Sequence, residues 1–220
     1  MLERLLQDRF SCRAFLPQQV ARDTIDKMLA MARRAPSWCN SQPWEVHVTS
    51  GAATDRFRKE LHGYAMSVAS MKPDFAFPLD YEGIYKDRQR ECGWQLYESV
   101  GIARGDRAAS ASQTMENFRL YGAPHALILT SERRLGTYGA LDCGIYTGIL
   151  LLAAQSLGLA AIAQGAIAGC APFVRTFFDL PESRVVLLGI SFGYADQAHP
   201  ANGFRTHRET LHNAAQWIDS

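Results

Sequence analysis

The chain has 220 residues and a formal net charge of +1 at pH 7, and 47% of its residues are hydrophobic. This length suits one compact domain with a sizeable core. A charge so close to zero provides no global field that would recruit nucleic acid or an anionic membrane, so we expect neither as a partner, and any positive charge that matters must be local.

The N-terminal part of the chain predicts helices around one loop and one strand. Leucines at helical spacing predict a first helix that ends near Phe10, and a second helix is expected over residues 22–34. The loop over residues 36–43 then leads into alternating apolar residues at 44–48, which read as a strand. Another helix is expected over residues 53–70.

Residues 71–110 give the weakest pattern in the chain. They contain prolines, several aromatics and a charged run, from which we expect short helices. The segment is rather long for an inert connection, which favours a functional role. We therefore treat residues 71–115 as a variable helical segment near the mouth of any active site.

The C-terminal half mixes strands and helices without strict alternation. A long helix over residues 141–157 is expected to end at Gly158 in a left-handed cap. Pro172 opens a short helix. Strands are expected over residues 126–130, 159–163 and 185–192. The mixture indicates an α+β fold rather than a doubly wound sheet, in a single domain spanning residues 1–220.

The cysteines are widely spaced and odd in number: Cys12, Cys39, Cys92, Cys143 and Cys170. No two form a Cys-x-x-Cys pair, so no metal site is predicted. We expect free thiols that serve as small buried packing residues in a reducing compartment. The charged opening residues lack the pattern of a secretory signal, which favours a cytoplasmic location.

Residues 189–193, GISFG, fit the Gly-x-Ser-x-Gly pattern of a serine hydrolase centred on Ser191. That motif requires a helix directly after the serine turn, which exposes the nucleophile. Here the following residues, YADQAHP, read as a loop. We therefore reject the hydrolase interpretation and interpret the motif as a strand end.

Two arginine pairs suggest a phosphate site. Arg9 and Arg13 flank Ser11, and Arg205 and Arg208 lie near the other end of the chain. Forked guanidinium donors and a hydroxyl are well suited to hold a phosphate ester. Each pair alone is more typical of a solvated face, so the hypothesis requires the fold to bring the two pairs together.

The combination of these residues with two longer motifs resembles the nitroreductase family. Residues 8–15, DRFSCRAF, and residues 35–44, APSWCNSQPW, carry most of the similarity, which continues through residues 158–165, GLAAIAQG. The resemblance implies an intertwined α+β homodimer with a central, mostly antiparallel sheet flanked by helices. It also implies FMN held at the subunit interface and NADH or NADPH as electron donor.

The resemblance assigns roles to site residues. Arg9, Ser11 and the tail arginines Arg205 and Arg208 would hold the FMN phosphate, and Phe10 is a further expected cofactor contact. Arg13 would face the pyrimidine edge of the flavin and stabilise its reduced anion. The partner subunit would contribute the loop residues Pro36, Ser37, Trp38, Asn40 and Gln42. Asn117 would place an amide against the ring, and Gln164 and Gly165 would lie near flavin N5. Leu120 and Ala163 are further expected cofactor contacts.

Residues 85–120 look most like the subgroup that reduces nitrobenzoates and other nitroarenes. The implied activity is ping-pong, two-electron reduction of a small aromatic nitro compound to the hydroxylamine. One of Arg88, Arg90, Arg104 and Arg107 could pair with a substrate carboxylate. The alternatives are a quinone, enone or flavin reductase on the same scaffold, and a protein that binds or degrades flavin without nicotinamide turnover.

Overall fold

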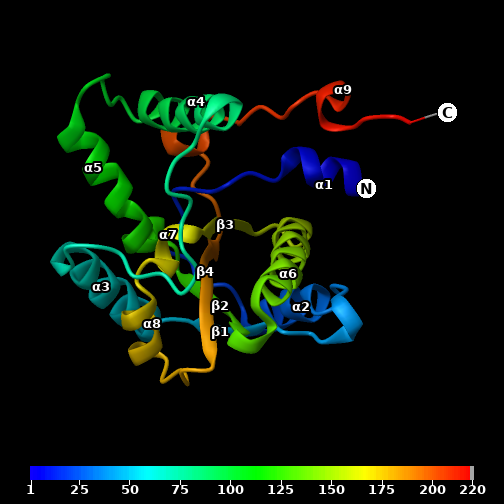
Figure 1. Cartoon of the computed structure of the whole chain (residues 1–220). Helices are drawn as coiled ribbons and strands as arrows, with labels where there is room; N and C mark the ends of the chain where they lie inside the picture. Colours follow the sequence, from blue (N-terminus) through cyan, green and yellow to red (C-terminus); the bar gives the residue numbers. More distant parts are fainter. Residues whose placement is uncertain (219–220) are drawn as a thin grey trace.

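The computed structural model describes residues 1–218 and centres on one antiparallel sheet (Figure 1). The strand order is β1-β2-β4-β3. The four strands are β1 (Glu45–Thr49), β2 (His125–Glu132), β3 (Ala160–Gln164) and β4 (Arg184–Gly193). This confirms the expected α+β class and the antiparallel sheet, and each expected strand is present within a few residues of its predicted bounds.

Both faces of the sheet are buried, which explains why β2 is buried at nearly every position and apolar on both faces over residues 126–129. Ala126 and Ile128 lie in one core cluster, whereas Leu127 and Leu129 lie in the other. Since side chains alternate between the faces of a strand, two cores require apolar residues at both phases.

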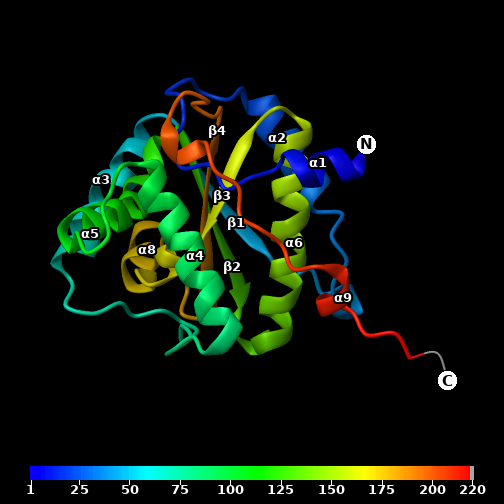
Figure 2. The same ribbon diagram turned by 90° about the horizontal axis from the view of Figure 1, so that it is seen from above.

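Helices cover the two faces in different ways (Figures 1 and 2). On one face, α2 (Arg22–Ala32) packs against the long helix α6 (Gly136–Ser156). The other face carries α3 (Ala52–Ser67), α7 (Gly165–Ala168) and α8 (Ala171–Phe177). The N-terminal helix α1 (Leu2–Asp8) contacts α6. Short 3-10 turns cover η1 (Trp38–Asn40), η3 (Arg133–Leu135) and η4 (Pro200–Asn202).

The middle segment differs from the expected short helices. After an irregular stretch, α4 (Gly83–Ser99) runs for 17 residues, followed by α5 (Arg107–Met115) and the 3-10 segment η2 (Glu116–Gly122). None of the α4 residues is buried. The prediction was wrong in length because a helix without a buried stripe has no apolar periodicity to read.

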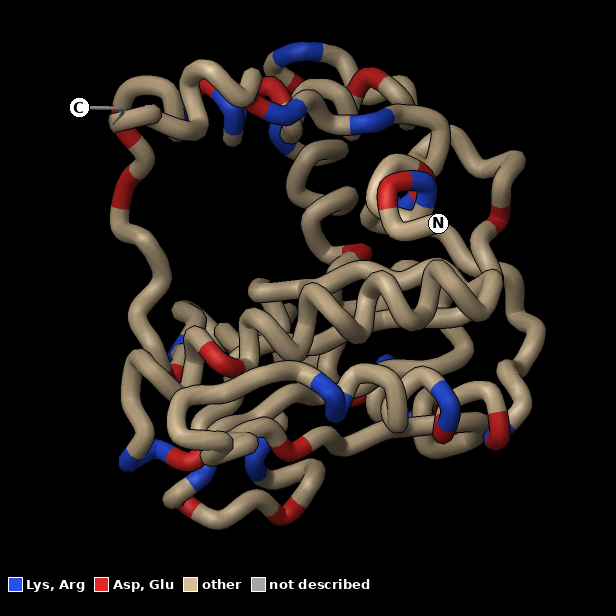
Figure 3. The backbone as a smooth tube through the Cα atoms, turned by 90° about the vertical axis from the view of Figure 1, so that its right-hand side faces the viewer, with Lys and Arg blue, Asp and Glu red and all other residues tan. Residues whose placement is uncertain are grey.

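Helix α6 begins at Gly136, earlier than expected, and Gly158 adopts the predicted left-handed conformation after it, with φ of +74°. The stretch 133–156 is long and apolar enough, by length and composition, to cross a membrane. Its buried residues nevertheless pack against α2 and the sheet. Asp142 is the only charged residue of α6, so most of this helix is tan in Figure 3. Its exposed apolar side chains include Tyr138, Leu141 and Ile145.

The cysteines are all free thiols in the described structure. Cys12, Cys143 and Cys170 are buried, and burial raises the pKa of each thiol to about 11. Cys39 is exposed and Cys92 is only half-buried, so the expectation of five buried packing residues was wrong for these two. Cys39 lies in η1 and Cys92 lies in α4, and neither of these elements has a buried residue.

His125 predicts a pH dependence of stability. Its ring is 1% exposed, and its Nε2 accepts a hydrogen bond from the backbone N–H of Val20 at 2.9 Å. Nδ1 therefore carries the hydrogen and faces the Thr49 carbonyl oxygen at 3.3 Å. Burial lowers the pKa of His125 below its ordinary value of 6.5. The folded chain thus binds fewer protons than the unfolded chain just below that pH.

Stability should be fully present above about pH 6.5 and should fall as the pH drops towards the folded-state pKa, by up to about 1.4 kcal/mol per pH unit. Thermal unfolding between pH 8 and pH 5 measures the slope. His125→Gln, which can make both hydrogen bonds without titrating, should flatten it. A residual slope from His47, whose pKa burial also lowers, should remain. The exposed His212→Gln is the control, and an equal slope in both variants would contradict the assignment.

Candidate functional site

The N-terminal segment after α1 is fixed along the sheet. Ser11 forms an isolated parallel bridge with Ala161 of β3, and the backbone N–H of Leu16 donates to the Tyr194 carbonyl at 2.8 Å. These contacts hold residues 9–13 beside the ends of β3 and β4.

Asn202 connects this segment to the C-terminal tail. Its Oδ1 accepts a hydrogen bond from the Arg13 backbone N–H at 2.7 Å. Its Nδ2 donates to the carbonyl oxygens of Ala14 and Asp196, both at 2.8 Å. The Asn202 carbonyl in turn accepts from the Arg205 guanidinium at 2.8 Å. Asn202 therefore fixes both arginine-bearing segments, one through its side-chain amide and the other through its backbone carbonyl.

The tail is also tied to α4. His207 Nδ1 lies 2.6 Å from a Glu91 carboxylate oxygen, and Arg88 forms an ion pair with Glu209. Hydrogen bonds from Asn213, the Thr210 backbone N–H and Arg88 hold the pKa of Glu209 at about 2, so this carboxylate stays ionised at neutral pH. These contacts place Arg208 between α4 and the N-terminal segment.

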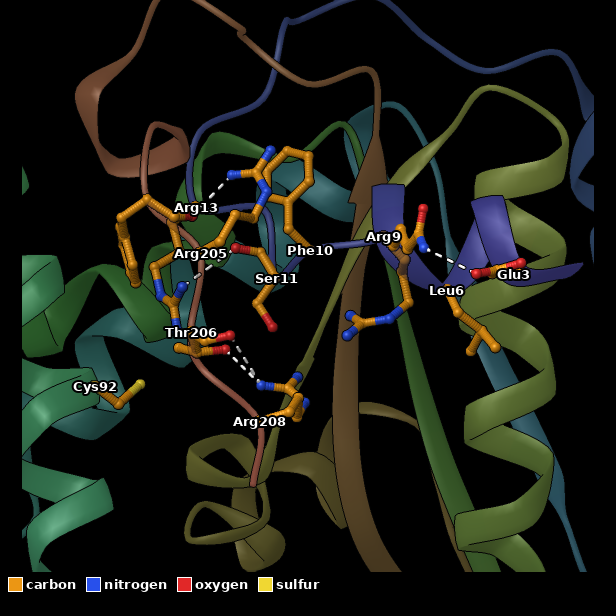
Figure 4. Close-up of a pocket in the computed structure, with 12 residues that line it drawn as sticks. Glu3, Leu6, Arg9, Phe10, Ser11, Arg13, Cys92, Arg205, Thr206 and Arg208 are labelled. Carbon is orange, nitrogen blue, oxygen red and sulfur yellow. Dashed lines mark hydrogen bonds between the residues drawn. The ribbon is translucent and has the colours of Figure 1, made fainter. Parts of the chain in front are cut away.

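A cavity of about 460 Å³ lies where the two segments meet (Figure 4). It is lined by Arg9, Phe10, Ser11, Arg13, Phe204, Arg205, Thr206 and Arg208, together with α1 residues and Cys92. The fold has therefore brought the two predicted arginine pairs together. Arg205 lies over the Phe10 ring, 4.0 Å from its centroid, and Arg13 lies 5.5 Å from that of Phe204.

Arg9 and Arg208 point toward each other across this cavity (Figure 4). Burial, and then the charge of Arg208, lowers the pKa of the Arg9 guanidinium. Neither arginine forms an ion pair with a carboxylate within residues 1–218. A guanidinium keeps its proton even so, and two facing cations without an acidic partner form a site for an anion with more than one negative charge. A phosphate monoester fits this arrangement.

A second group of predicted residues lies where β3 enters α7, beside η2. Ala163 and Gly165 are exposed, whereas the Gln164 side chain is 2% exposed and turns inward. Its Nε2 donates to the Asn117 carbonyl at 2.8 Å. Leu120 is fully buried, so its side chain belongs to the core and only its backbone can face a ligand. Gln164 likewise can offer a ligand only its backbone.

The loop over residues 36–42 forms the third group. Cys39, Asn40 and Gln42 have positive φ values of 49°, 56° and 47°, a conformation that costs energy for non-glycine residues and is frequent at functional sites. Asp142 of α6, 4% exposed, holds the loop by accepting from the Trp38 backbone N–H at 3.1 Å and from the Ser41 hydroxyl.

This loop and the arginine cavity are far apart in one chain. Contacts of Trp38 with Tyr138 and Asp142 place the loop at the start of α6. In Figure 1, α1 and the C-terminal tail lie towards the other end of this helix. The exposed loop residues Pro36, Trp38, Asn40 and Gln42, with the half-buried Ser37, are therefore not assembled with Arg9 and Arg208. A single copy of the chain brings together only part of the predicted site.

The sequence did not predict the roles of two residues that shape the site, Asp142 and Asn202. A lone carboxylate inside an otherwise apolar helix was a usable signal for Asp142. Asn202 lies in a polar tail and carried no such signal. Among the described residues no group of three or more His, Cys, Asp or Glu side chains is placed to hold a metal ion.

Comparison with known proteins settles the family, since the profile of the Nitroreductase family matches residues 6–194. The chain belongs to the nitroreductase family. It is 36% identical over 212 residues to nitroreductase NfnB of Mycolicibacterium smegmatis, covering 95% of this chain and 89% of that protein. It is 34% identical to a 4-nitrobenzoate reductase of Pseudomonas putida, covering 93% and 90% of the two chains.

The fold of this nitroreductase matches a solved structure closely. The crystal structure of FMN-dependent NfnB from Mycobacterium smegmatis in complex with NADPH superposes with a TM-score of 0.93, covering 99% of this chain and 97% of the other, at 35% identity. The expected nitroreductase fold and the enzyme class are thereby confirmed. The hydrolase alternative is excluded by the burial of Ser191, which is 0% exposed.

Proposed function

We propose that this nitroreductase binds FMN as a homodimer and reduces nitroarenes with electrons from NADH or NADPH. The observation that carries the proposal is the pair of facing arginines, Arg9 and Arg208, in a cavity that also holds Ser11. Relatives described as FMN-dependent nitroreductase and 4-nitrobenzoate reductase support the activity. When bound, FMN supplies two-electron transfer between the nicotinamide and the acceptor.

The residues of this chain would bind FMN and orient its ring. Arg9, Arg208 and the Ser11 hydroxyl would hold the phosphate, and Arg13 would lie near the pyrimidine edge of the ring, where its fixed charge favours the reduced anion. Ala163 and Gly165 would present their backbone to the ring face. No general base is required of the protein for this chemistry.

The separation of the loop over residues 36–42 from the arginine cavity supports a site shared by two chains. The exposed apolar side chains of Tyr138, Leu141 and Ile145 on α6 offer a surface that a second copy would cover. In such a dimer, the loop of one chain would complete the cavity of its partner. A location in the cytoplasm is part of the same proposal.

An anaerobic titration tests the function. Purified protein should carry FMN, and the addition of NADH or NADPH should bleach the flavin absorbance, which a nitroarene should then restore. Sedimentation of the same sample should give a dimer. A colourless protein after reconstitution with excess FMN would refute the cofactor, and a monomer with full FMN occupancy would refute the shared site. A yellow protein that neither nucleotide bleaches would favour flavin binding without turnover.

The acceptor is proposed to be a nitroarene that bears a carboxylate. Of the four candidate arginines, Arg88 is occupied by Glu209, which leaves Arg90, Arg104 and Arg107. Arg104 lies 5.1 Å from the Trp94 ring centroid and lines a surface cavity of about 290 Å³. A cation beside an aromatic ring suits a benzoate, because the ring can stack while the carboxylate pairs.

We expect kcat/KM for 4-nitrobenzoate to exceed that for nitrobenzene by tenfold or more, about 1.4 kcal/mol at the transition state. Arg104→Ala should remove this preference and leave nitrobenzene turnover unchanged, with Arg134→Ala as the matched surface control. Equal turnover of both nitroarenes by the wild type would refute the carboxylate pairing. Turnover of a benzoquinone alone would replace the nitroarene assignment with a quinone reductase.

A further inference from the structure

The GISFG segment has a structural explanation at each of its fixed positions. A Cβ on Gly189 would lie 2.5 Å from Ile167 Cδ1, so glycine allows α7 to pack closely on β4. A Cβ on Gly193 would lie 2.7 Å from two ring carbons of Pro124. Ser191, between them, is fully buried, and its hydroxyl bonds to the side chain of Gln164.

The register of the sheet brings Ser191 and Gln164 together. Gln164 pairs with Gly189 and Ile162 pairs with Ser191 in the antiparallel β3–β4 ladder. Residues two apart in a strand share a face, so Ser191 and Gln164 are diagonal neighbours on one side of the sheet. Because position 189 is glycine, no side chain stands directly opposite Gln164.

The hydrogen bonds determine how the Gln164 amide is oriented. The Asn117 carbonyl can only accept, so the Gln164 NH₂ group must face it, at 2.8 Å. The amide oxygen of Gln164 then faces Ser191, whose hydroxyl donates. The same NH₂ group lies 3.4 Å from Asn117 Oδ1. Both oxygens of Asn117 are thus directed toward Gln164.

This chain of bonds ends at the surface where the flavin ring is expected. The Asn117 amide nitrogen donates one hydrogen bond, to the Thr114 carbonyl at 3.1 Å, among the contacts of residues 1–218. Its second N–H is available to a ligand. Asn117 is the second residue of the segment η2, whose Leu120 and Tyr121 have positive φ values of 58° and 51°. A strained segment of this kind keeps its conformation only when neighbouring groups hold it.

We propose that Ser191, acting through Gln164, positions the Asn117 amide against the flavin ring. This inference rests on the proposed function, because it requires FMN to bind beside η2. Ser191 and Gln164 are positioning residues, since neither side chain reaches the surface. The serine that resembles a hydrolase nucleophile therefore orients the cofactor site from inside the sheet.

The test measures binding of FMN and of riboflavin by fluorescence titration, together with the visible circular dichroism and midpoint potential of bound FMN. Ser191→Ala should raise the dissociation constants of both ligands by the same factor, between about threefold and tenfold, the scale of one hydrogen bond. The circular dichroism and the potential should shift as well, because the ring environment has changed. Ser131→Ala removes a hydroxyl from β2 that is 1% exposed and outside this hydrogen-bond chain, and it should leave all four readouts unchanged.

A double-mutant cycle tests whether Ser191 acts through Gln164. Gln164→Met should weaken flavin binding at least as much as Ser191→Ala, and the double variant should bind flavin as Gln164→Met does. Additive effects would overturn the inference, and so would wild-type binding and dichroism in a folded Ser191→Ala protein. In either case wild-type FMN binding would leave the proposed function intact, whereas a wild type that binds no flavin would refute the proposed function itself.

Discussion

Replacing Asn202 with alanine is expected to lower the free energy of unfolding by roughly 2–4 kcal/mol. The side chain is 3% exposed and makes hydrogen bonds to the Arg13 N–H and to the Ala14 and Asp196 carbonyls. Alanine would leave the Arg13 N–H without a partner in a buried site, which costs the desolvation of that donor. The Ala14 and Asp196 carbonyls would each lose one bond but would still accept one from the backbone N–H of Asp196 and of His199, respectively. For a chain of this length the melting temperature should fall by about 2–4 °C per kcal/mol.

Two further variants separate the contribution of this clamp from a general effect of losing asparagine. Asn213→Ala removes an exposed amide that bonds to Glu209, and stability should change by less than about 0.5 kcal/mol. Asn202→Asp keeps the acceptor for Arg13 but loses both donated bonds, so it should be destabilised as well. Equal melting temperatures for Asn202→Ala and Asn213→Ala would show that the two chain ends are held together by other contacts.

Features that depend on residues close together in the sequence could be predicted, whereas contacts between residues far apart in the sequence could not. The strands and the helices with buried faces, such as α2 and α6, were predicted because their apolar residues repeat along the chain. The clamp at Asn202 joins residues 189 positions apart, and Asp142 reaches Trp38 across 104 positions. Such pairings leave no local pattern, so only the folded chain reveals them.

The backbone at η2 could not be predicted for a different reason. Leu120 and Tyr121 adopt left-handed conformations that sequence reasoning reserves for glycine, asparagine and aspartate. The surrounding packing imposes them, since both side chains are buried in the core. The arginine pairs were the opposite case. The residue types of the two pairs predicted a phosphate site, and in the folded chain Arg9 and Arg208 line the same cavity.

Arg208→Ala should weaken FMN binding by about 1.5–3 kcal/mol, which is roughly 10- to 150-fold, the scale of a charge-assisted hydrogen bond. The same change should not destabilise the protein without ligand. Burial and the neighbouring charge of Arg208 lower the pKa of Arg9. Without an anion between them, the two guanidinium groups therefore repel each other, which destabilises the folded protein. Removing one of them relieves that repulsion. Stability without FMN and affinity for FMN should therefore respond in different ways.

Measuring riboflavin binding to the same variants tests whether Arg208 contacts the phosphate of FMN. It has the same ring as FMN but lacks the phosphate, so Arg208→Ala and wild type should bind riboflavin equally well. Arg9→Ala should show the same contrast between the two ligands. Arg134→Ala, a substitution on the 3-10 turn η3, is the matched control and should bind both ligands as wild type does. An equal loss for FMN and riboflavin would mean that the tail arginine supports the ring site or the fold, because a phosphate contact cannot weaken a ligand that has no phosphate.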